Sequence, residues 1–344
     1  MRILSYPEAL NEAISSEMER DEKVIVMGQG VQDPKAILGT LKDIEERFGP
    51  ERIIDVPLAE DGITGVAIGA AINGHRPIHV HIRNDFLLLA MNQIVNMAAK
   101  FRYMYGGQHS VPMVVRAIIG KSWGQGPQHS QSIYPMLMNV PGIKIVAPST
   151  PYDAKKYMIG SIRDNNPVIF IEHRHLYYQK GPVPIEYNDY GIDKGRCLKE
   201  GSHITLVGVS QMAIECLRAA DILGEQGIEA EVIDPIALNP IDYDMIEKSV
   251  SKTGNLVFVD NGWMKCGAGS EIIVNLIERI GSEFSFVRLG FAQTTCPTSP
   301  TLEEAFYPNP KTVAKAAANL LDTLPNWEPV FSKKVAEVEF KGPF

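Results

Sequence analysis

The segment KVIVMGQG, residues 23–30, decides the fold class. It is an apolar run that ends in a glycine turn, and the residues before it, 5–20, carry Ala9, Ile14 and Met18 at helical spacing. A helix that leads into a buried strand of this kind is typical of a parallel sheet. The segment therefore predicts an α/β fold.

Outward from residues 23–30, further apolar runs predict the other strands of this sheet, with helical or Gly/Ala-rich segments between them. These runs are residues 52–56, 77–80, 112–115, 143–146 and 168–171. After a stretch with weak periodicity the same alternation starts again, which predicts a second, smaller α/β domain. Its strands are expected at residues 204–207, 230–233 and 256–259.

The two blocks of strands and helices set the expected domain boundaries. We predict a first domain over residues 1–185, a linker over 186–200, a second domain over 201–323 and a C-terminal arm over 324–344. The arm lacks a helix pattern and alternates charged with apolar side chains near its end. We interpret it as a disordered or self-packing segment, with docking on a partner as the alternative.

The composition fits a water-soluble globular chain, with 344 residues, 45% hydrophobic and 22% charged residues and a formal net charge of -8. Lys and Arg form no long runs, so a surface for nucleic acid or an anionic membrane is not expected. The four cysteines are widely spaced without a CxxC pair, which favours free thiols in a reducing compartment, the cytoplasm. No stretch approaches the ~20 apolar residues that cross a bilayer, and we expect no membrane segment and no secretion.

Two positions in the first domain have the chemistry of a catalytic site. Glu60 follows an expected strand and precedes the Gly/Ala-rich helix of residues 65–71, which places its carboxylate where open α/β sheets bind ligands. His129 lies in a glycine-rich loop among amides and hydroxyls, where an imidazole can move protons. The alternatives stay open: a helix cap or a solvated side chain for Glu60, and an ordinary surface histidine for His129.

Two His-x-His pairs lie in expected strands. Each pair would place both imidazoles on one side of its strand, a geometry that a metal ion can use. Because no third ligand is near either pair in the sequence, polar lining of a cleft is the favoured interpretation. The pairs are His79/His81 and His173/His175.

A series of short motifs runs through the first domain. The motifs are VPLAE at 56–60, NQI at 92–94, NMAAK at 96–100, YMYGG at 103–107, QHSQS at 128–132 and PSTPYDA at 148–154. Together they resemble the beta subunits of thiamin-diphosphate-dependent 2-oxo acid dehydrogenases of the pyruvate, branched-chain and acetoin type, within the transketolase-like superfamily. The likeness covers about residues 4–323.

That resemblance implies two doubly wound α/β domains of the thiamin-diphosphate-binding fold, a pyrimidine-binding domain followed by a transketolase C-terminal domain. It implies a beta subunit of an α2β2 enzyme that oxidatively decarboxylates a 2-oxo acid and transfers the acyl group to the lipoyl group of a dihydrolipoyl acyltransferase. In the family the alpha subunit holds the diphosphate and its magnesium ion, and this sequence has no G-D-G-x-N-N motif for that ion. We therefore expect the chain to be active only with an alpha subunit.

The resemblance also implies roles for single residues. Glu60 takes the place of the glutamate that hydrogen-bonds the aminopyrimidine ring of the cofactor and promotes proton exchange, and His129 matches the histidine that faces substrate and acceptor. Phe86 matches the aromatic residue that packs against the pyrimidine, and Leu58 is counted with Glu60 and Phe86 as cofactor-binding. Three residues match a segment that binds potassium in some members, with a plain turn as the alternative: Ile162, Asp164 and Asn166.

The sequence departs from the family near the expected site. Gln29 replaces a usual glutamate, and an amide cannot exchange a proton as a carboxylate does. His81 and Arg83 stand in a stretch that is usually apolar or aromatic, and Leu89 stands where pyruvate dehydrogenases can have glutamine. Arg83 can bind a substrate carboxylate or phosphate in a bidentate manner, and an outward-facing, salt-bridged arginine is the alternative.

Because of these departures, a second hypothesis stays open. The chain would then belong to a two-subunit thiamin-diphosphate-dependent carboligase or transketolase-like enzyme, which transfers the fragment of the donor substrate to an aldehyde, ketone or sugar. A non-catalytic assembly subunit is a third hypothesis. The presence of Glu60, Phe86 and His129 disfavours it.

Overall fold

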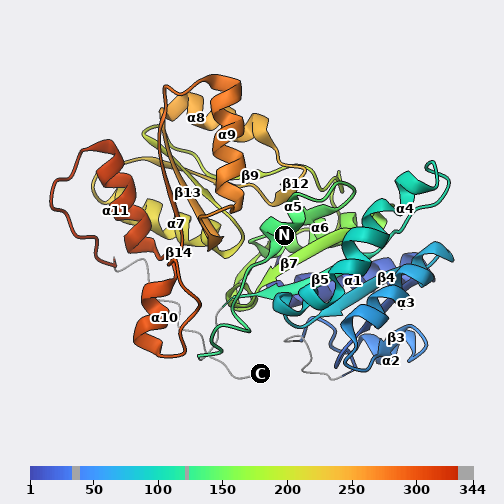
Figure 1. The fold of residues 1–344 in the computed structure, drawn as a ribbon. Helices are drawn as coiled ribbons and strands as arrows, with labels where there is room; N and C mark the ends of the chain where they lie inside the picture. Colours follow the sequence, from blue (N-terminus) through green and yellow to red (C-terminus); the bar gives the residue numbers. More distant parts are fainter. Residues whose placement is uncertain (33–38, 121–123, 332–344) are drawn as a thin grey trace. The chain divides into compact units, whose positions relative to one another are not determined.

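The computed structural model describes residues 1–32, 39–120 and 124–331 of the chain (Figure 1). Most of the arm expected over residues 324–344 therefore lies outside the described residues. None of the helices within the described ranges combines the length and the apolar character that crossing a bilayer requires.

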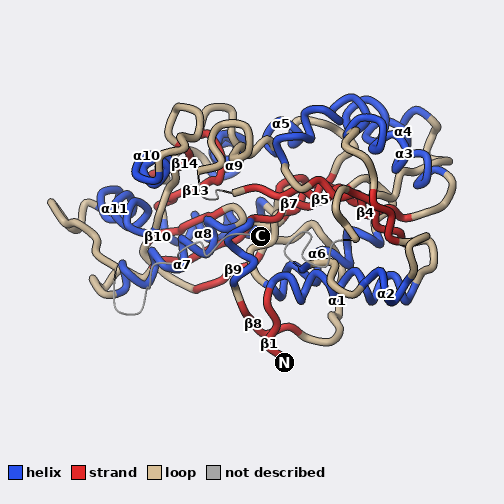
Figure 2. The backbone as a smooth tube through the Cα atoms, turned by 90° about the horizontal axis from the view of Figure 1, so that it is seen from below, coloured by secondary structure: helices blue, strands red, loops and turns tan. Residues whose placement is uncertain are grey.

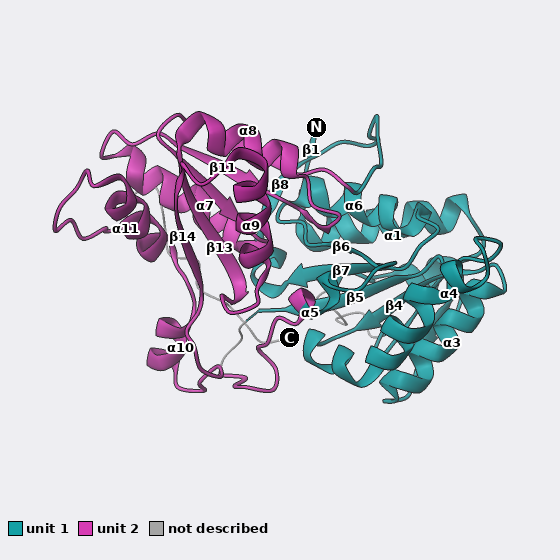
Figure 3. Cartoon of the chain, turned by 45° about the horizontal axis from the view of Figure 1, so that its top comes forward, with its two compact units in different colours: residues 1–120, 136–192, 343–344 teal, residues 121–135, 193–342 magenta. Residues whose placement is uncertain are grey.

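The chain forms two compact units (Figure 3). Unit 1 holds the described residues up to 120 together with residues 136–192, and unit 2 holds residues 124–135 together with residues 193–331. The segment 124–135 thus belongs to unit 2, although the chain on both sides of it belongs to unit 1.

Unit 1 is built on a parallel sheet. Its strands are β2 Val24–Gly28, β3 Ile53–Asp55, β4 Arg76–His81, β5 Val114–Ile119, β6 Lys144–Val146 and β7 Val168–His173. They follow one another across the sheet in the order β6-β7-β5-β4-β2-β3, and every pair of neighbours is parallel. The central strands are buried over nearly their whole length, which explains why they read as continuous apolar runs without alternation.

Helices cover both faces of this sheet. They are α1 Tyr6–Arg20, α2 Ile44–Phe48, α3 Glu60–Ile72, α4 Ala99–Met104 and α6 Pro151–Arg163, with a 3-10 helix at Asn84–Ala90 and a π-helix at Asn92–Ala98. Figure 2 shows α1 and α6 on one face and α3 and α4 on the other. α1 begins at a capping box, in which Ser5 and Glu8 satisfy each other's backbone N–H groups. Near the start of α1, β1 Arg2–Ser5 pairs antiparallel with β8 Lys180–Val183.

Unit 2 repeats this plan on a smaller scale. Its strands are β9 Arg196–Lys199, β10 Ile204–Gly208, β11 Ala230–Asp234, β12 Ala237–Asn239, β13 Asn255–Trp263 and β14 Ser285–Phe291. One sheet has the order β14-β13-β10-β11-β9, in which only β9 runs antiparallel to its neighbour. The helices are α7 Gln211–Gly224, α8 Tyr243–Thr253, α9 Ala268–Ile280, α10 Pro300–Phe306 and α11 Pro310–Leu321. α7 packs against α11, and α8 packs against α9. The predicted fold class, two α/β units with mainly parallel sheets, is confirmed.

An ion pair is buried in the middle of unit 1. The Arg116 side chain on β5 donates to both carboxylate oxygens of Glu172 on β7, from Nε at 2.6 Å and from Nη2 at 2.9 Å. Both side chains are fully shielded from solvent, and Tyr177 Oη donates to the same carboxylate at 2.7 Å. A charge pair in such a place is tolerated only because each charge has its partner and its hydrogen bonds.

We predict that Glu172→Gln lowers the free energy of unfolding by about 3–5 kcal/mol, because it leaves a buried guanidinium without its counter-charge. Urea unfolding followed by circular dichroism measures the loss. The control is Lys156→Met, which removes an ion pair to the exposed Asp189 and should change the same quantity by less than about 1 kcal/mol. Equal losses in the two variants would contradict the special role of the buried pair.

Candidate functional site

Glu60 lies beyond the end of β3, at the start of α3. The strand ends at Asp55, a short segment without regular structure follows, and α3 begins at Glu60 itself. The N-cap residue is Ala59, and no side chain caps this end of the helix. Glu60 is therefore not a helix cap, which was one of the alternatives that the sequence left open. Glu60 is half-buried and is the first residue of the helix, where the backbone N–H groups have no partner within the helix.

A chain of hydrogen bonds connects the backbone of Glu60 to β4. Thr64 Oγ1 donates to Glu60 O at 2.6 Å, and His79 Nε2 lies 3.1 Å from the same hydroxyl oxygen. Burial lowers the pKa of His79 to about 4, so the ring is neutral at pH 7 and carries a single proton. Its Nδ1 lies 3.3 Å from Met27 O, and because a carbonyl oxygen can only accept, Nδ1 is the nitrogen that donates there. The contacts of His79 with Met27 and Thr64 connect the first turn of α3 to the sheet.

His81 lies beside His79, as the His-x-His spacing predicts. The two rings are 4.3 Å apart in an edge-on arrangement, and both are buried. Burial, and then the neighbouring imidazole, hold the pKa of His81 well below its usual value. Its Nε2 has no hydrogen-bond partner within the part of the chain that the structure describes.

Three other predicted site residues lie just beyond β4 on or before the 3-10 helix. Arg83 is half-buried, its Nη1 donates to Ile82 O at 3.3 Å, and its Nε has no partner among the described residues. Burial lowers the pKa of Arg83 although Asp85 opposes this. Phe86 is half-buried, and Leu89 is exposed. Leu58, which precedes Glu60, is 76% exposed in this single chain.

His129 belongs to unit 2, unlike the residues above. It is half-buried in the segment 124–135, and its backbone N–H donates to Gly126 O at 3.4 Å. The structure therefore groups Glu60, Phe86, His81 and Arg83 in one unit and His129 in the other.

The turn that was matched to a potassium site is held by basic side chains. Arg76 Nη1 donates to the carbonyl oxygens of Ile162 at 2.8 Å and Asp164 at 3.0 Å. The Asp164 carboxylate pairs with Lys144 and accepts from the backbone N–H of Asn166 at 2.8 Å. An ion bound by the carbonyl oxygens of Ile162 and Asp164 would share them with the Arg76 guanidinium, and potassium at this turn stays a prediction.

Within the described residues, neither His-x-His pair belongs to a group of three metal-ligating side chains, whereas Cys197, Glu200 and Glu231 form such a group. Lys252 pairs with both carboxylates of that group. The interpretation of the histidines as polar lining of a cleft stays a prediction.

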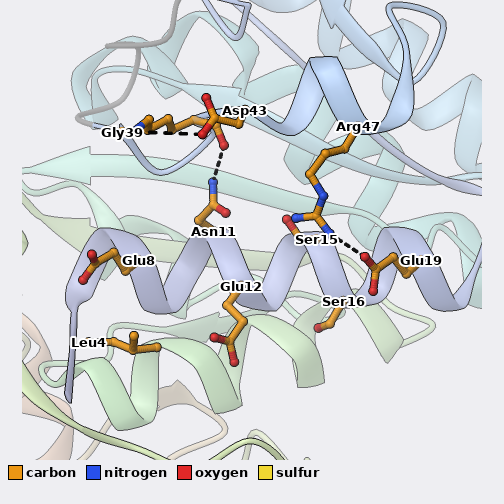
Figure 4. A pocket seen from close by; sticks show the side chains of 11 residues that line it. Leu4, Glu8, Asn11, Glu12, Ser15, Ser16, Glu19, Gly39, Asp43 and Arg47 are labelled. Carbon is orange, nitrogen blue, oxygen red and sulfur yellow. Dashed lines mark hydrogen bonds and ion pairs between the residues drawn. The ribbon is translucent and has the colours of Figure 1, made fainter. Parts of the chain in front are cut away.

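A hollow of about 460 Å³ on unit 1 is lined by α1 and the segment before α2 (Figure 4). Its carboxylates have structural partners: Glu8 completes the capping box, Glu12 pairs with Arg2, and Glu19 pairs with Arg47. None of the site residues expected from the sequence lines it.

Comparison with known proteins gives the family. The model of the transketolase pyrimidine binding domain matches residues 3–180, and that of the transketolase C-terminal domain matches residues 193–313. The chain belongs to the transketolase family. Over 335 residues this transketolase-family chain is 37% identical to the acetoin:2,6-dichlorophenolindophenol oxidoreductase subunit beta of Bacillus subtilis (strain 168), covering 93% of this chain and 98% of the relative.

A second relative of this transketolase-family chain is the mitochondrial pyruvate dehydrogenase E1 component subunit beta of Bos taurus. It is 37% identical over 324 residues, with 92% of this chain and 90% of the relative covered. A solved split-gene transketolase, described as an inactive beta4 tetramer, matches with a TM-score of 0.75 and 22% identity over 93% of this chain and 99% of that one, which shows a common fold. The resemblance that the motifs carried is thereby confirmed.

Thr64 is a residue of the site region that the sequence did not single out. The feature of the sequence that could have pointed to Thr64 is its hydroxyl group, which lies four residues after Glu60 in a helix otherwise rich in Gly and Ala. Its partner His79 was noticed only as half of a possible metal pair, because nothing local in the sequence links residues on α3 and β4.

We predict that burial of neutral His79 makes the fold sensitive to acid. A pKa near 4 in the folded chain, against about 6.5 when unfolded, means that protonation favours the unfolded state as the pH falls below about 6.5. Between pH 7 and pH 5 this contributes a loss of about 2 kcal/mol. Unfolding free energies of the wild type and of His79→Gln, measured across this range, should differ in slope, with the variant less sensitive. Parallel curves would contradict the assignment.

Proposed function

We propose that this chain is the beta subunit of a thiamin-diphosphate-dependent 2-oxo acid dehydrogenase, active with an alpha subunit in an α2β2 assembly, with a lipoyl group as acyl acceptor. The observation that carries the proposal is the position of Glu60 at the N-terminus of α3, beyond the end of a parallel strand. The chain that carries it is 37% identical to beta subunits named as an acetoin oxidoreductase and as a pyruvate dehydrogenase E1 component. We further propose that the assembly works in the cytoplasm.

The residues of unit 1 fit the pyrimidine end of the cofactor. Glu60 offers a carboxylate, Phe86 a half-buried ring and Leu58 an exposed apolar side chain that a ligand or a partner would cover. We assign the diphosphate and magnesium to the alpha subunit. When bound, thiamin diphosphate supplies an electron sink for the carbon from which carbon dioxide leaves.

This chain's own residues would handle protons and orientation. Glu60 would exchange a proton with a ring nitrogen of the pyrimidine, and its backbone is kept in place for this by Thr64 and neutral His79. His129 would donate to, or take a proton from, the group that accepts the acyl fragment. Because Gln29 is an amide, we expect it to carry no proton between paired sites. Potassium at Ile162, Asp164 and Asn166 remains a further proposal.

A second candidate is a carboligase or transketolase-like enzyme that uses the same cofactor with an aldehyde, ketone or sugar as acceptor. The Nε of half-buried Arg83 and the Nε2 of buried His81 favour it, because each of these atoms lacks a partner among the described residues and each could hydrogen-bond an anionic or hydroxylated substrate.

We predict that Glu60→Gln lowers turnover by roughly 10²- to 10⁴-fold, because an amide cannot exchange the proton that a carboxyl group does. The measurement is reduction of an artificial electron acceptor with a panel of 2-oxo acids, using this chain co-expressed with its alpha subunit, thiamin diphosphate and magnesium. The matched control is Asp61→Asn, the same change at the adjacent, exposed position, which should retain nearly full turnover. A fully active Glu60→Gln enzyme would rule out the proton role.

We also predict that Arg83→Gln separates substrates by charge. Loss of a bidentate, charge-assisted contact should raise KM roughly 10- to 100-fold for donors or acceptors that carry a second carboxylate or a phosphate. Donors with only the reacting 2-oxo acid group should be little affected. Arg102→Gln, at an exposed position in unit 1, is the control. If Arg83→Gln raised KM equally for substrates with and without the second anionic group, Arg83 would not bind that group.

A further inference from the structure

The loop that carries His129, residues 124–135, is fitted closely onto unit 2. Gly124 and Gly126 have φ angles of +71° and +72°, which glycine adopts without strain. A Cβ at Gly124 would lie 2.6 Å from Thr298 O, and a Cβ at Gly126 would lie 2.8 Å from Thr298 Cγ2. The start of the loop therefore rests directly on the segment that precedes α10.

The end of the same loop is held by a buried hydrogen bond. Tyr134, the first residue of α5 Tyr134–Met138, donates its hydroxyl to Asp260 Oδ1 on β13. Both residues are buried, at 0% and 3% exposure. Tyr134 is the fifth residue after His129, so this contact limits how far the histidine can move.

Asp260 is itself fixed by the backbone of unit 2. Its carboxylate accepts from the backbone N–H groups of Asn261 and of Ala268, the first residue of α9. Burial raises the pKa of Asp260 to about 6, and hydrogen bonds from Tyr134 and the two N–H groups oppose the rise. The group is thus mainly ionised at pH 7, at the positive end of α9, and is a strong acceptor for the tyrosine.

We infer that Tyr134 and Asp260 are positioning residues for His129. They connect the loop to β13 and α9 at one end, while the Thr298 segment supports the other end. A histidine that serves a transfer step has to be held in place before the acceptor arrives, and a displacement of about 1 Å can slow such a step 10²-fold. This role rests on the proposed function of His129, whereas the anchoring of the loop does not.

The anchoring is tested first, on the complete chain without cofactor, by hydrogen exchange of peptides that cover residues 124–133. Tyr134→Phe removes only the hydroxyl and should increase opening of these peptides roughly tenfold or more. Asp260→Asn keeps the shape of the side chain and should act in the same direction. The control is Tyr243→Phe on α8, which removes a hydroxyl 3.5 Å from Glu271 in the same unit. Unchanged exchange in both loop variants, with intact circular dichroism spectra, overturns the anchoring.

The positioning role is tested next in the assembled enzyme. Tyr134→Phe should slow acyl transfer to a lipoyl acceptor roughly 10- to 100-fold and leave reduction of an artificial electron acceptor nearly unchanged. The same substitution should have little further effect on transfer in a His129→Ala background, because the group it positions is gone. Equal slowing of both half-reactions, or full additivity with His129→Ala, overturns the role. A wild-type assembly without either half-reaction would instead overturn the proposed function, and the exchange result would still decide the anchoring.

Discussion

Parallel pairing of β2, β3 and β4 brings the carboxyl ends of three strands to one edge of the unit 1 sheet, and the proposed site depends on this edge. Two of these strands lead to residues of the proposed site: the chain leaving β3 leads to Glu60, and the chain leaving β4 leads to Arg83. Because α3 packs on β4, a histidine within that strand can reach the first turn of the helix. The sheet thus supplies both the place of the carboxylate and its support.

Unit 1 buries polar side chains in two different ways. On β4 the imidazoles of His79 and His81 are buried as neutral groups, and this removes the cost of desolvating a charge. One strand further, Arg116 keeps its charge because Glu172 on β7 accompanies it. The neutral imidazoles make the stability of the fold depend on pH, because protonating them costs free energy in the folded chain. The neutral histidines lie on β4, the strand that leads to Arg83 of the proposed site. The ion pair lies on β5 and β7, which are further than β4 from β3 and Glu60 in the order of strands across the sheet.

The fold was predictable because buried parallel strands give continuous apolar runs and because the strand–helix alternation repeats. The position of Glu60 followed for the same reason: a residue between a strand and a helix lies at the sheet edge whatever its distant contacts. The contacts themselves were not predictable. Arg76 meets Ile162 and Asp164 across more than 80 residues of chain, and Tyr134 meets Asp260 across 126, so no local pattern reports them. The motifs made His129 a candidate site residue and placed it in the first domain, whereas the structure assigns its segment to unit 2, because the contacts of that segment are with distant residues such as Thr298 and Asp260.

Residues 124–135 belong to unit 2 although they lie within the sequence of unit 1, and this affects the design of fragments of the protein. A cut between residues 192 and 193 looks natural, since the compact units meet there in sequence. The N-terminal fragment would nevertheless retain the His129 segment while losing Thr298 and Asp260, and it would expose the hydroxyl of Tyr134 with no acceptor from β13. Two fragments made in this way should be mixed to recover the loop, as the halves of a split reporter are, and neither should be taken to represent an independent domain.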